Sequence, residues 1–284
     1  MAHVTPVEDA AARLYRVLSH EPASLFSDFD GTLSPMAPTP DGAALAPGVR
    51  DVLRALARRI ELVGIVTGRA VNDARERVGV PELLYVGNHG LEWAERGVHV
   101  DHPVGIAAAD SISTALHQIG AEIGSTLGLG GLVFEDKRLS GSIHYRLSED
   151  PVTMGLALGE ITERVAIAHG LHVASGKMVY ELRPTASVSK GTALREIVLQ
   201  RNLRSAVFLG DDVTDVDGFR ALRALREGEG LPTLAVGVLT PDTAPSVIAE
   251  SDLLLDGVDD VVRTLNALDH LLAADRIRAT ELES

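Results

Sequence analysis

The feature that most constrains this chain is a series of short apolar runs, each of which ends in a polar motif. Residues 23–26 lead into SDFDGTL, residues 60–66 end at TGR, and residues 206–209 end at GDDVTD. Short, continuously apolar runs are typical of parallel strands that helices cover on both faces. Because open α/β sheets place their sites at the carboxyl ends of the strands, we expect these motifs to converge. The pattern predicts an α/β fold with one polar site at the end of a parallel sheet.

Helical segments alternate with these runs. Residues 7–18 carry apolar positions at roughly helical spacing, and a helix that opens at Pro47 extends to Arg59. Strand, helix and strand in this order form a βαβ unit, which builds parallel sheets. We therefore expect a Rossmann-like parallel-sheet core. Its further expected elements are helix 71–78, strand 83–86, helix 191–200, helix 216–226, strand 233–238, strand 253–255 and a final helix from Val258.

The alternation changes after about Pro103. A helix with small side chains over residues 107–127 precedes FEDKRLSGSIHYRL, which alternates as an antiparallel strand pair should. A helix over residues 152–168 and the strands LHVASG and KMVYELRP follow. This stretch predicts an inserted α/β cap domain. The expected domains are residues 1–103 (core, first part), 104–182 (cap) and 183–284 (core, second part).

The composition restricts the partners. The 284 residues carry a formal net charge of -14, which disfavours nucleic acid and anionic membranes because both are bound through Lys and Arg. The absence of cysteine excludes disulfides, thiolate nucleophiles and Cys-ligated zinc. The chain shows no leader-like segment and no apolar run of bilayer length, so we expect a soluble, cytoplasmic protein. If such an acidic protein handles an anionic phosphate, it needs a local positive device, either a bound cation or a few focused Lys and Arg side chains, which directs attention to a metal site.

Asp28 and Asp30 are the first candidates for chemistry, because both follow the first predicted strand directly. Asp28 can attack phosphorus as a nucleophile. Asp30 can protonate the leaving oxygen and later activate water, provided that its environment differs from that of its neighbour. Gly31 gives the backbone room for a sharp turn. The alternative, that one of these carboxylates only caps the next segment, stays open at this point.

Three further groups complete a candidate phosphate site. The hydroxyl of Thr67 and nearby backbone N–H groups could hold a phosphoryl oxygen, and Lys190 could balance the charge between nucleophile and phosphate. Asp211 could hold Mg²⁺ together with Asp28 and the backbone carbonyl of Asp30, since Mg²⁺ prefers hard oxygen ligands. The alternatives are helix capping by Thr67 or by an aspartate, and a surface position for Lys190.

Taken together, DFDGTL, TGR, Lys190 and GDDVTD resemble the four signatures of the haloacid dehalogenase superfamily. About 37 residues separate Asp30 from Thr67, whereas roughly a hundred separate Asn88 from Lys190, so a folded cap fits only after the second signature. That position resembles the sugar-phosphatase branch. Within this branch, GNHGLE, FEDKRLSGSIHYR, GKMVYELRP, KGTAL and GDDVTD are similar to motifs of the trehalose-6-phosphate phosphatases, over about residues 24–219.

This resemblance implies a core of the haloacid dehalogenase type and Mg²⁺-dependent hydrolysis of trehalose 6-phosphate through an aspartyl-phosphate. The catalytic residues that it implies are Asp28, Asp30, Thr67 and Lys190. The implied substrate-binding residues are Gly68, Arg69, Asn88 and His89 in the core and Glu135, Lys137, Arg146, Lys177 and Glu181 in the cap. The implied metal ligands are Asp28, Asp30, Asp211 and Asp215, with Asp212 as the alternative to Asp215.

Two alternatives to this function stay open. Val216 stands where members of the family commonly carry an acidic residue, which leaves room for another phosphorylated sugar. Sucrose phosphate, mannosyl-phosphoglycerate and the pseudo-disaccharide validoxylamine 7'-phosphate are the candidates. A non-catalytic regulatory binding protein of the same fold is the second alternative. We expect the protein to be a monomer that binds a small-molecule sugar phosphate. It could also couple loosely to a trehalose-phosphate synthase.

Overall fold

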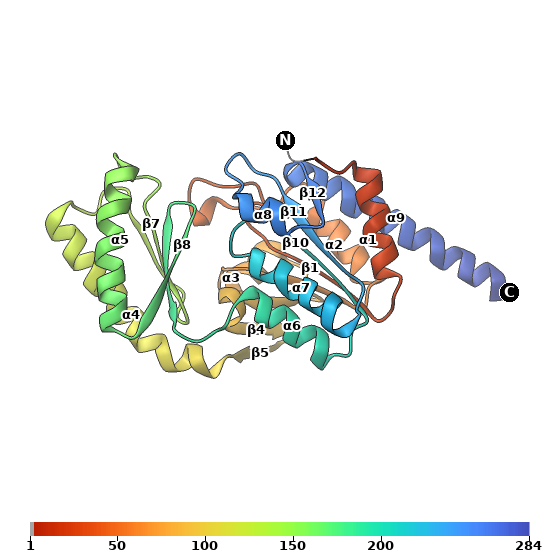
Figure 1. The fold of residues 1–284 in the computed structure, drawn as a ribbon, viewed down its shortest axis with the longest axis horizontal. Helices are drawn as coiled ribbons and strands as arrows, with labels where there is room; N and C mark the ends of the chain where they lie inside the picture. Colours follow the sequence, from red (N-terminus) through yellow and green to blue (C-terminus); the bar gives the residue numbers. More distant parts are fainter. Residues whose placement is uncertain (1–2, 284) are drawn as a thin grey trace. The chain divides into compact units, whose positions relative to one another are not determined.

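The computed structural model describes residues 3–283, with side chains through Asp275. It divides into two compact units (Figure 1). The core unit comprises the chain up to His99 and again from Val188 onward, and the inserted unit comprises Val100–Ser187. The chain therefore leaves the core unit and returns to it once. Residues 1, 2 and 284, which the predicted domain ranges include, lie outside the described residues.

The core unit is built on a sheet of eight strands. They span Ala23–Ser27 (β1), Leu62–Val66 (β2), Leu84–Gly87 (β3), Glu92–Glu95 (β4), Val98–Asp101 (β5), Ser205–Gly210 (β10), Thr233–Val238 (β11) and Leu253–Leu255 (β12). The order is β12-β11-β10-β1-β2-β3-β4-β5, with parallel neighbours from β12 to β3 and β4 antiparallel to β3. Every residue of β1, β2 and β10 is buried, which explains their continuous apolar sequences.

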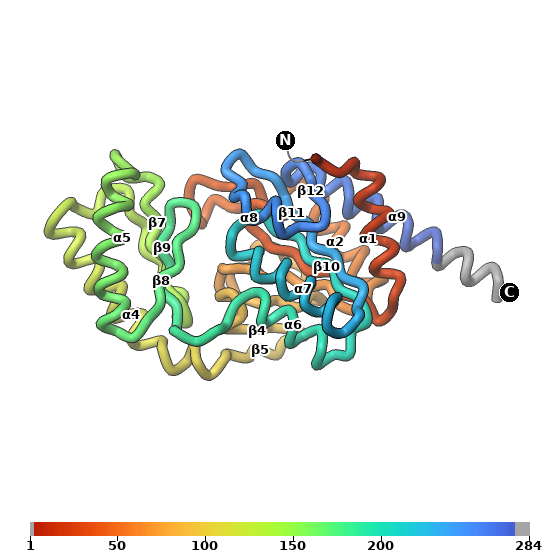
Figure 2. The backbone as a smooth tube through the Cα atoms, viewed as in Figure 1, coloured from red at the N-terminus to blue at the C-terminus, as the bar shows by residue number. Residues whose placement is uncertain are grey.

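Helices cover both faces of this sheet. They span Val7–Leu18 (α1), Val49–Leu56 (α2), Val71–Val78 (α3), Lys190–Gln200 (α6), Val216–Glu229 (α7), Pro245–Glu250 (α8) and Gly257–Glu283 (α9). Leu25 of β1 packs with apolar residues of α1, α2, α3 and α9, whereas its neighbour Phe26 packs with residues of α6, α7 and α8. The first helix, α1, lies against the last, α9 (Figure 2). Both ends of the chain thus stabilise the same face of one sheet.

The inserted unit has a sheet of its own. Its elements span Pro103–Thr126 (α4), Val133–Asp136 (β6), Gly141–His144 (β7), Pro151–Ala168 (α5), Leu171–Gly176 (β8) and Val179–Pro184 (β9). The strands are antiparallel in the order β6-β7-β9-β8. Ile143 and Leu182 pack with apolar residues of α4 and α5. The register aligns Glu135 with Ser142 and Ser142 with Glu181, so these three lie on the opposite, polar face.

The predicted fold class is confirmed, namely a parallel-sheet α/β core with an inserted α/β unit. Some predicted boundaries are wrong. Helix α2 ends at Leu56 and β2 begins at Leu62. Between them the N–H groups of Arg59 and Ile60 both donate to Leu56 O at 2.9 Å, and the apolar Ile60 is buried in this turn rather than in the strand. The sequence patterns did not indicate β4, β5 and α8, which have 4, 4 and 6 residues. Within the described residues, no helix combines the length and hydropathy that crossing a membrane requires.

Candidate active site

Asp28 lies at the carboxyl end of β1, where its backbone N–H donates to Leu209 O at 2.8 Å and continues the pairing with β10. The residue is 5 % exposed, and its Oδ1 lies 3.0 Å from Lys190 Nζ. Burial raises the pKa of Asp28 well above its usual range, Lys190 opposes this shift, and neighbouring carboxylates add to it. The ionised form of Asp28 therefore needs more positive charge than Lys190 supplies.

Asp211 and Asp215, which follow β10, meet Asp28 in one buried group. Each of the three presents an oxygen within 4.8 Å of the others, and we call them the acidic cluster. Asp215 Oδ1 accepts from Lys190 Nζ at 2.6 Å, and Asp215 Oδ2 accepts the backbone N–H groups of Asp211 and Asp212, each at 3.0 Å. Asp212 is only partly buried, and its carboxylate is not a member of the cluster. Asp215 is thus the better placed of the two alternative ligands.

The acidic cluster fits a divalent cation. The buried group combines three carboxylates with one ammonium, which contacts Asp28 and Asp215, so the ionised side chains carry an excess of two negative charges. Buried charges need partners, since desolvation otherwise penalises them heavily. Mg²⁺ prefers carboxylate oxygens. Asp28, Asp211 and Asp215 are therefore the residues that could hold it.

The first and last motifs touch at Gly31. Its φ is +78°, and a Cβ added there would lie 2.3 Å from Asp211 Oδ2, so only glycine fits. Thr32 Oγ1 donates to Asp211 Oδ1 across 3.4 Å. The turn that follows Asp28 therefore fixes the position of Asp211.

Lys190 is the first residue of α6 and is 2 % exposed, so it is not a surface lysine. Burial alone lowers the pKa of Lys190, but the charges of Asp215 and Asp28 outweigh burial and raise this pKa above its ordinary value. Lys190 therefore stays protonated between these two carboxylates.

The TGR and GNHG motifs form two turns that hold each other through the backbone. Asn88 N–H donates to Arg69 O at 2.8 Å, and His89 N–H donates to Thr67 O at 3.0 Å. Thr67 Oγ1 accepts from Arg69 N–H at 3.2 Å, which is the local contact expected of a capping hydroxyl. A Cβ at Gly68 would lie 2.4 Å from His89 Nε2, so glycine lets the turns close together. The structure thus brings these five predicted site residues into contact.

Glu92, a residue without an assigned role in the sequence analysis, supports these turns. It is 4 % exposed, and its Oε1 accepts from Asn88 Nδ2 at 2.5 Å and from the N–H of Val71, the first residue of α3, at 2.9 Å. Its Oε2 lies 3.1 Å from His99 Nε2. Glu92 occupies an inward position of β4, where a charge is unusual. That inward charge is the signal that could have revealed it.

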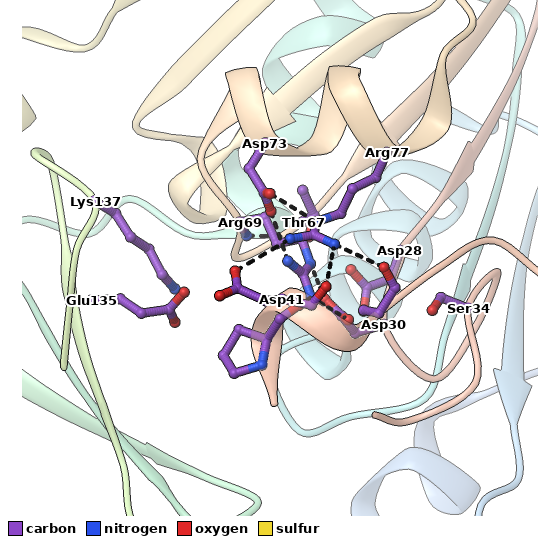
Figure 3. Close-up of polar contacts among 12 residues, drawn as sticks. Asp28, Asp30, Ser34, Asp41, Thr67, Arg69, Asp73, Arg77, Glu135 and Lys137 are labelled. Carbon is purple, nitrogen blue, oxygen red and sulfur yellow. Dashed lines mark hydrogen bonds and ion pairs between the residues drawn. The ribbon is translucent and has the colours of Figure 1, made fainter. Parts of the chain in front are cut away.

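Asp30 and Arg69 form a bidentate ion pair (Figure 3). Arg69 Nε donates to Asp30 Oδ2 at 2.7 Å, and Arg69 Nη2 donates to Asp30 Oδ1 at 2.8 Å. Arg69 also donates to Asp73, which accepts from Arg77 as well. Burial alone lowers the pKa of Arg69, but Asp30 and Asp73 outweigh it and raise this pKa. No role was predicted for Asp73 and Arg77, although their spacing of four residues along a helix could have indicated an ion pair.

The five residues expected to bind substrate in the inserted unit fall into two groups. Glu135 and Glu181 lie on the polar face of the sheet, where Lys137 Nζ donates to Glu181 Oε1 at 3.4 Å. Arg146 and Lys177 meet beyond the ends of β7 and β8, where Arg146 Nη2 donates to Lys177 O at 3.1 Å. The strand register accounts for the first group and the β8–β9 turn for the second.

Two further polar residues accompany the first group. His144 Nε2 lies 2.6 Å from Glu135 Oε2, and Arg183 Nε donates to Glu181 Oε2 at 2.7 Å. Both stand one strand period from polar-face positions, His144 after Ser142 and Arg183 after Glu181. Strict alternation along the two strands could therefore have found them.

Comparisons with known proteins point to one family. The trehalose-phosphatase family model matches residues 26–243. A trehalose-phosphate phosphatase of Mycobacterium tuberculosis is 36 % identical over 214 residues, which cover 72 % of this chain and 52 % of that protein. A protein of the same organism described as an uncharacterized glycosyl hydrolase is 35 % identical over 234 residues, which cover 78 % of this chain and 17 % of that protein.

The fold also has a close likeness among solved structures. The C-terminal domain of trehalose-6-phosphate phosphatase from C. albicans aligns with a TM-score of 0.77 at 20 % identity, over 95 % of this chain and 98 % of that domain. At this low sequence identity, the structural match shows a shared fold and nothing more. The chain spans about half the length of the phosphatase from M. tuberculosis and 17 % of the other relative.

Proposed function

Because the chain belongs to the trehalose-phosphatase family, we propose that it hydrolyses trehalose 6-phosphate to trehalose and phosphate. One observation carries the proposal: Asp28, Asp211 and Lys190, which are far apart along the chain, meet in one buried group. A nucleophile, a candidate metal ligand and a lasting positive charge are thereby available to a single phosphoryl group.

The proposed reaction has two steps. Asp28 attacks phosphorus while the bond between phosphorus and the sugar oxygen breaks, and Asp30 gives its proton to the departing oxygen. Trehalose leaves as a neutral alcohol, and an aspartyl-phosphate remains. Water then attacks this phosphorus, Asp30 takes up a proton of the water, and the bond from phosphorus to Asp28 breaks.

Fixed groups of the core unit stabilise the charge that develops. Lys190 stays protonated between its carboxylates and offsets negative charge on the phosphoryl oxygens. Thr67 and the backbone N–H groups around Gly68 hold one phosphoryl oxygen. Their positions are set before the substrate arrives, so little reorganisation accompanies the reaction.

Mg²⁺ completes the proposed site. Asp28, Asp211 and Asp215 would hold it, with the backbone carbonyl of Asp30 as a further donor. When bound, this ion would neutralise charge on the phosphoryl group and on the cluster itself.

Recognition of the sugar is assigned to Asn88 and His89 in the core unit and to polar residues of the inserted unit. Carboxylates accept hydrogen bonds from sugar hydroxyls, and Lys and Arg donate to phosphate oxygens. The residues of the inserted unit with this role are Glu135, Lys137, Arg146, Lys177 and Glu181. The two groups that they form, one on the sheet and one at the turn, suit a substrate with two ends of different chemistry.

A phosphate-release panel with Mg²⁺ tests the proposal. It includes trehalose 6-phosphate, glucose 6-phosphate, sucrose phosphate, mannosyl-phosphoglycerate and validoxylamine 7'-phosphate. We expect the highest kcat/KM with trehalose 6-phosphate. A higher value with another sugar phosphate would keep the chemistry and replace the substrate. No turnover of any of them by the folded, Mg²⁺-loaded protein would favour the non-catalytic binding protein instead.

The cellular setting belongs to the same proposal. We place the reaction in the cytoplasm, carried out by a monomer with a loose association to a trehalose-phosphate synthase. Light scattering of the purified protein tests the monomer, and co-purification with a synthase at low ionic strength tests the association. A stable dimer, or no retention of the synthase, would contradict the respective statement.

A further inference from the structure

We infer that Arg69 is a positioning residue that orients Asp30 for proton transfer, and that Asp73 and Arg77 hold Arg69 in place. This inference rests on the proposed function, because it concerns the proton that Asp30 delivers to the leaving oxygen. It also gives Arg69 a different role from substrate binding, which the family resemblance implied.

Four of the five N–H donors of Arg69 are already engaged. Nε and Nη2 bind the two oxygens of Asp30, Nη1 binds Asp73 Oδ2 at 2.6 Å, and Nη2 also binds Pro40 O at 2.9 Å. The guanidinium carbon lies 5.2 Å from the ring centre of Phe29. The Arg69 side chain is only 10 % exposed. A phosphate could therefore receive a bidentate pair of hydrogen bonds from this guanidinium only if one of these contacts were broken.

Asp73 and Arg77 brace this pair from α3. Asp73 Oδ1 accepts from Arg77 Nε at 2.7 Å, while its other oxygen accepts from Arg69 (Figure 3). Arg77 Nη1 in turn donates to Ala43 O at 2.8 Å and to Asp41 O at 3.1 Å. We call Arg69, Asp73 and Arg77 the arginine brace. It ties Asp30 and the 40–43 turn, which follows Asp30 in the chain, to one rigid helix.

A planar guanidinium suits this orienting role. Two parallel N–H donors fix both oxygens of a carboxylate and so fix the rotation of its plane, which a point charge cannot do. A carboxyl group that donates a proton must lie within hydrogen-bond reach of the leaving oxygen, with its oxygen turned toward it. The brace therefore restricts Asp30 to a narrow range of orientations before the substrate binds.

The inference predicts a dependence on the leaving group. A sugar alkoxide is a strong base and needs a proton as it departs, whereas p-nitrophenolate is a stable anion that leaves without one. The value of kcat/KM covers the steps through the first cleavage of the P–O bond. Misplacing Asp30 should therefore lower kcat/KM for trehalose 6-phosphate and spare kcat/KM for p-nitrophenyl phosphate.

The experiment compares Arg69→Met with wild type on both substrates. We expect a loss of about 100-fold with trehalose 6-phosphate, the usual scale of general acid catalysis, and less than about 5-fold with p-nitrophenyl phosphate. Arg69→Lys keeps the charge without the fork and should fall between, at about 10-fold with the sugar phosphate. Equal losses on both substrates would overturn the inference, because a phosphate-binding or purely structural Arg69 affects both alike.

A double-mutant cycle gives a second measurement that needs only trehalose 6-phosphate. If Arg69 acts through Asp30, adding Arg69→Met to Asp30→Asn should change kcat/KM by less than about 2-fold, because the orienting effect is already lost. Losses that multiply would overturn the inference. Turnover of neither substrate by the wild-type protein would overturn the proposed function and this inference together.

Arg59→Met is the matched control. Arg59 Nε donates to Asp269 Oδ1 at 2.6 Å, so this variant also removes a half-buried arginine from a carboxylate, but outside the site. We expect wild-type kcat/KM with both substrates. A leaving-group dependence in Arg59→Met equal to that of Arg69→Met would overturn the inference.

Discussion

Asp28 of the acidic cluster and Asp30, which the arginine brace holds, lie two residues apart in the chain, yet their charges are balanced in opposite ways. In the cluster, three buried carboxylates lie close together, and the ammonium of Lys190 contacts two of them, Asp28 and Asp215. At the brace, the partly exposed carboxylates of Asp30 and Asp73 meet the guanidinium groups of Arg69 and Arg77. The cluster is short of positive charge, and the brace is balanced by its own side chains.

This difference teaches where an external cation is needed. Both regions are rich in aspartate, so residue counting alone would give each a metal site. Burial and local balance separate them, since a buried excess of negative charge is costly whereas a paired carboxylate needs no further partner. Two carboxyl groups in such different surroundings can also take different roles in one reaction, as nucleophile and as proton carrier.

The largest expected effect comes from Asp28→Asn in the cluster. The amide keeps the size of the carboxylate but cannot form the aspartyl-phosphate, so kcat should fall by at least about 1,000-fold. Circular dichroism should show an unchanged fold, and phosphate release measures the loss. Retention of a tenth of the wild-type rate would remove Asp28 from the role of nucleophile.

Removal of Mg²⁺ should be the next largest effect, and it should be specific to the cluster. Treatment with EDTA should abolish turnover, and added Mg²⁺ should restore it. Mg²⁺ at 100 times its Kd should also stabilise the wild-type protein by about 2.7 kcal/mol, visible as a rise in Tm.

Two variants sharpen that comparison of Tm. Asp211→Asn should lose the response to Mg²⁺, because it removes a ligand from the cluster. Asp73→Asn should respond as wild type does, because the brace needs no cation. An equal response in all three proteins would show that the ion binds elsewhere.

Lys190→Met tests the charge balance within the cluster. Without its ammonium, the buried carboxylates lack their fixed partner, so unfolding by urea should require about 3 kcal/mol less free energy at neutral pH. Turnover should fall by about 100-fold as the fixed positive charge is lost. Mg²⁺ should recover part of the stability but little of the rate. An unchanged unfolding curve in the absence of Mg²⁺ would contradict the deduced shortage of positive charge.

The smallest effect is expected for Asp73→Asn in the brace. Asp73 is partly exposed, and such pairs contribute at most about 1 kcal/mol to stability. Arg69 keeps its direct contact with Asp30, so kcat/KM for trehalose 6-phosphate should fall by less than about 5-fold. A loss as large as that of Arg69→Met would mean that orientation depends on Asp73 as much as on Arg69.

The sequence predicted the convergence of Asp28 with Asp211, because both follow apolar runs typical of buried parallel strands, whose carboxyl ends share one edge of the sheet. The structure shows that these two strands are neighbours. Lys190 follows no apolar run, so a surface position stayed open beside its charge-balancing role until the family resemblance favoured that role. The choice between Asp212 and Asp215 could not be made, since it depends on how one turn directs two side chains. Asp215 faces inward because its carboxylate caps the backbone N–H groups of that same turn.

Contacts that side chains make across the fold were harder to predict from the sequence. The pairing of Arg69 with Asp30 joins two loops, and nothing in either motif states their distance. Glu92 lies in a strand of 4 residues, and its inward charge becomes a signal only once that strand is recognised. The same limit explains why β4 and β5 were not predicted.

Gly31 has a consequence for how relatives of this protein should be read. A single methyl group at this position would occupy the space of the Asp211 carboxylate, although every charged residue of the four motifs would be intact. Such a sequence would still match a search for the acidic motifs, yet the protein would be inactive. Whether this position holds glycine thus distinguishes active relatives from inactive ones that carry the same charged residues.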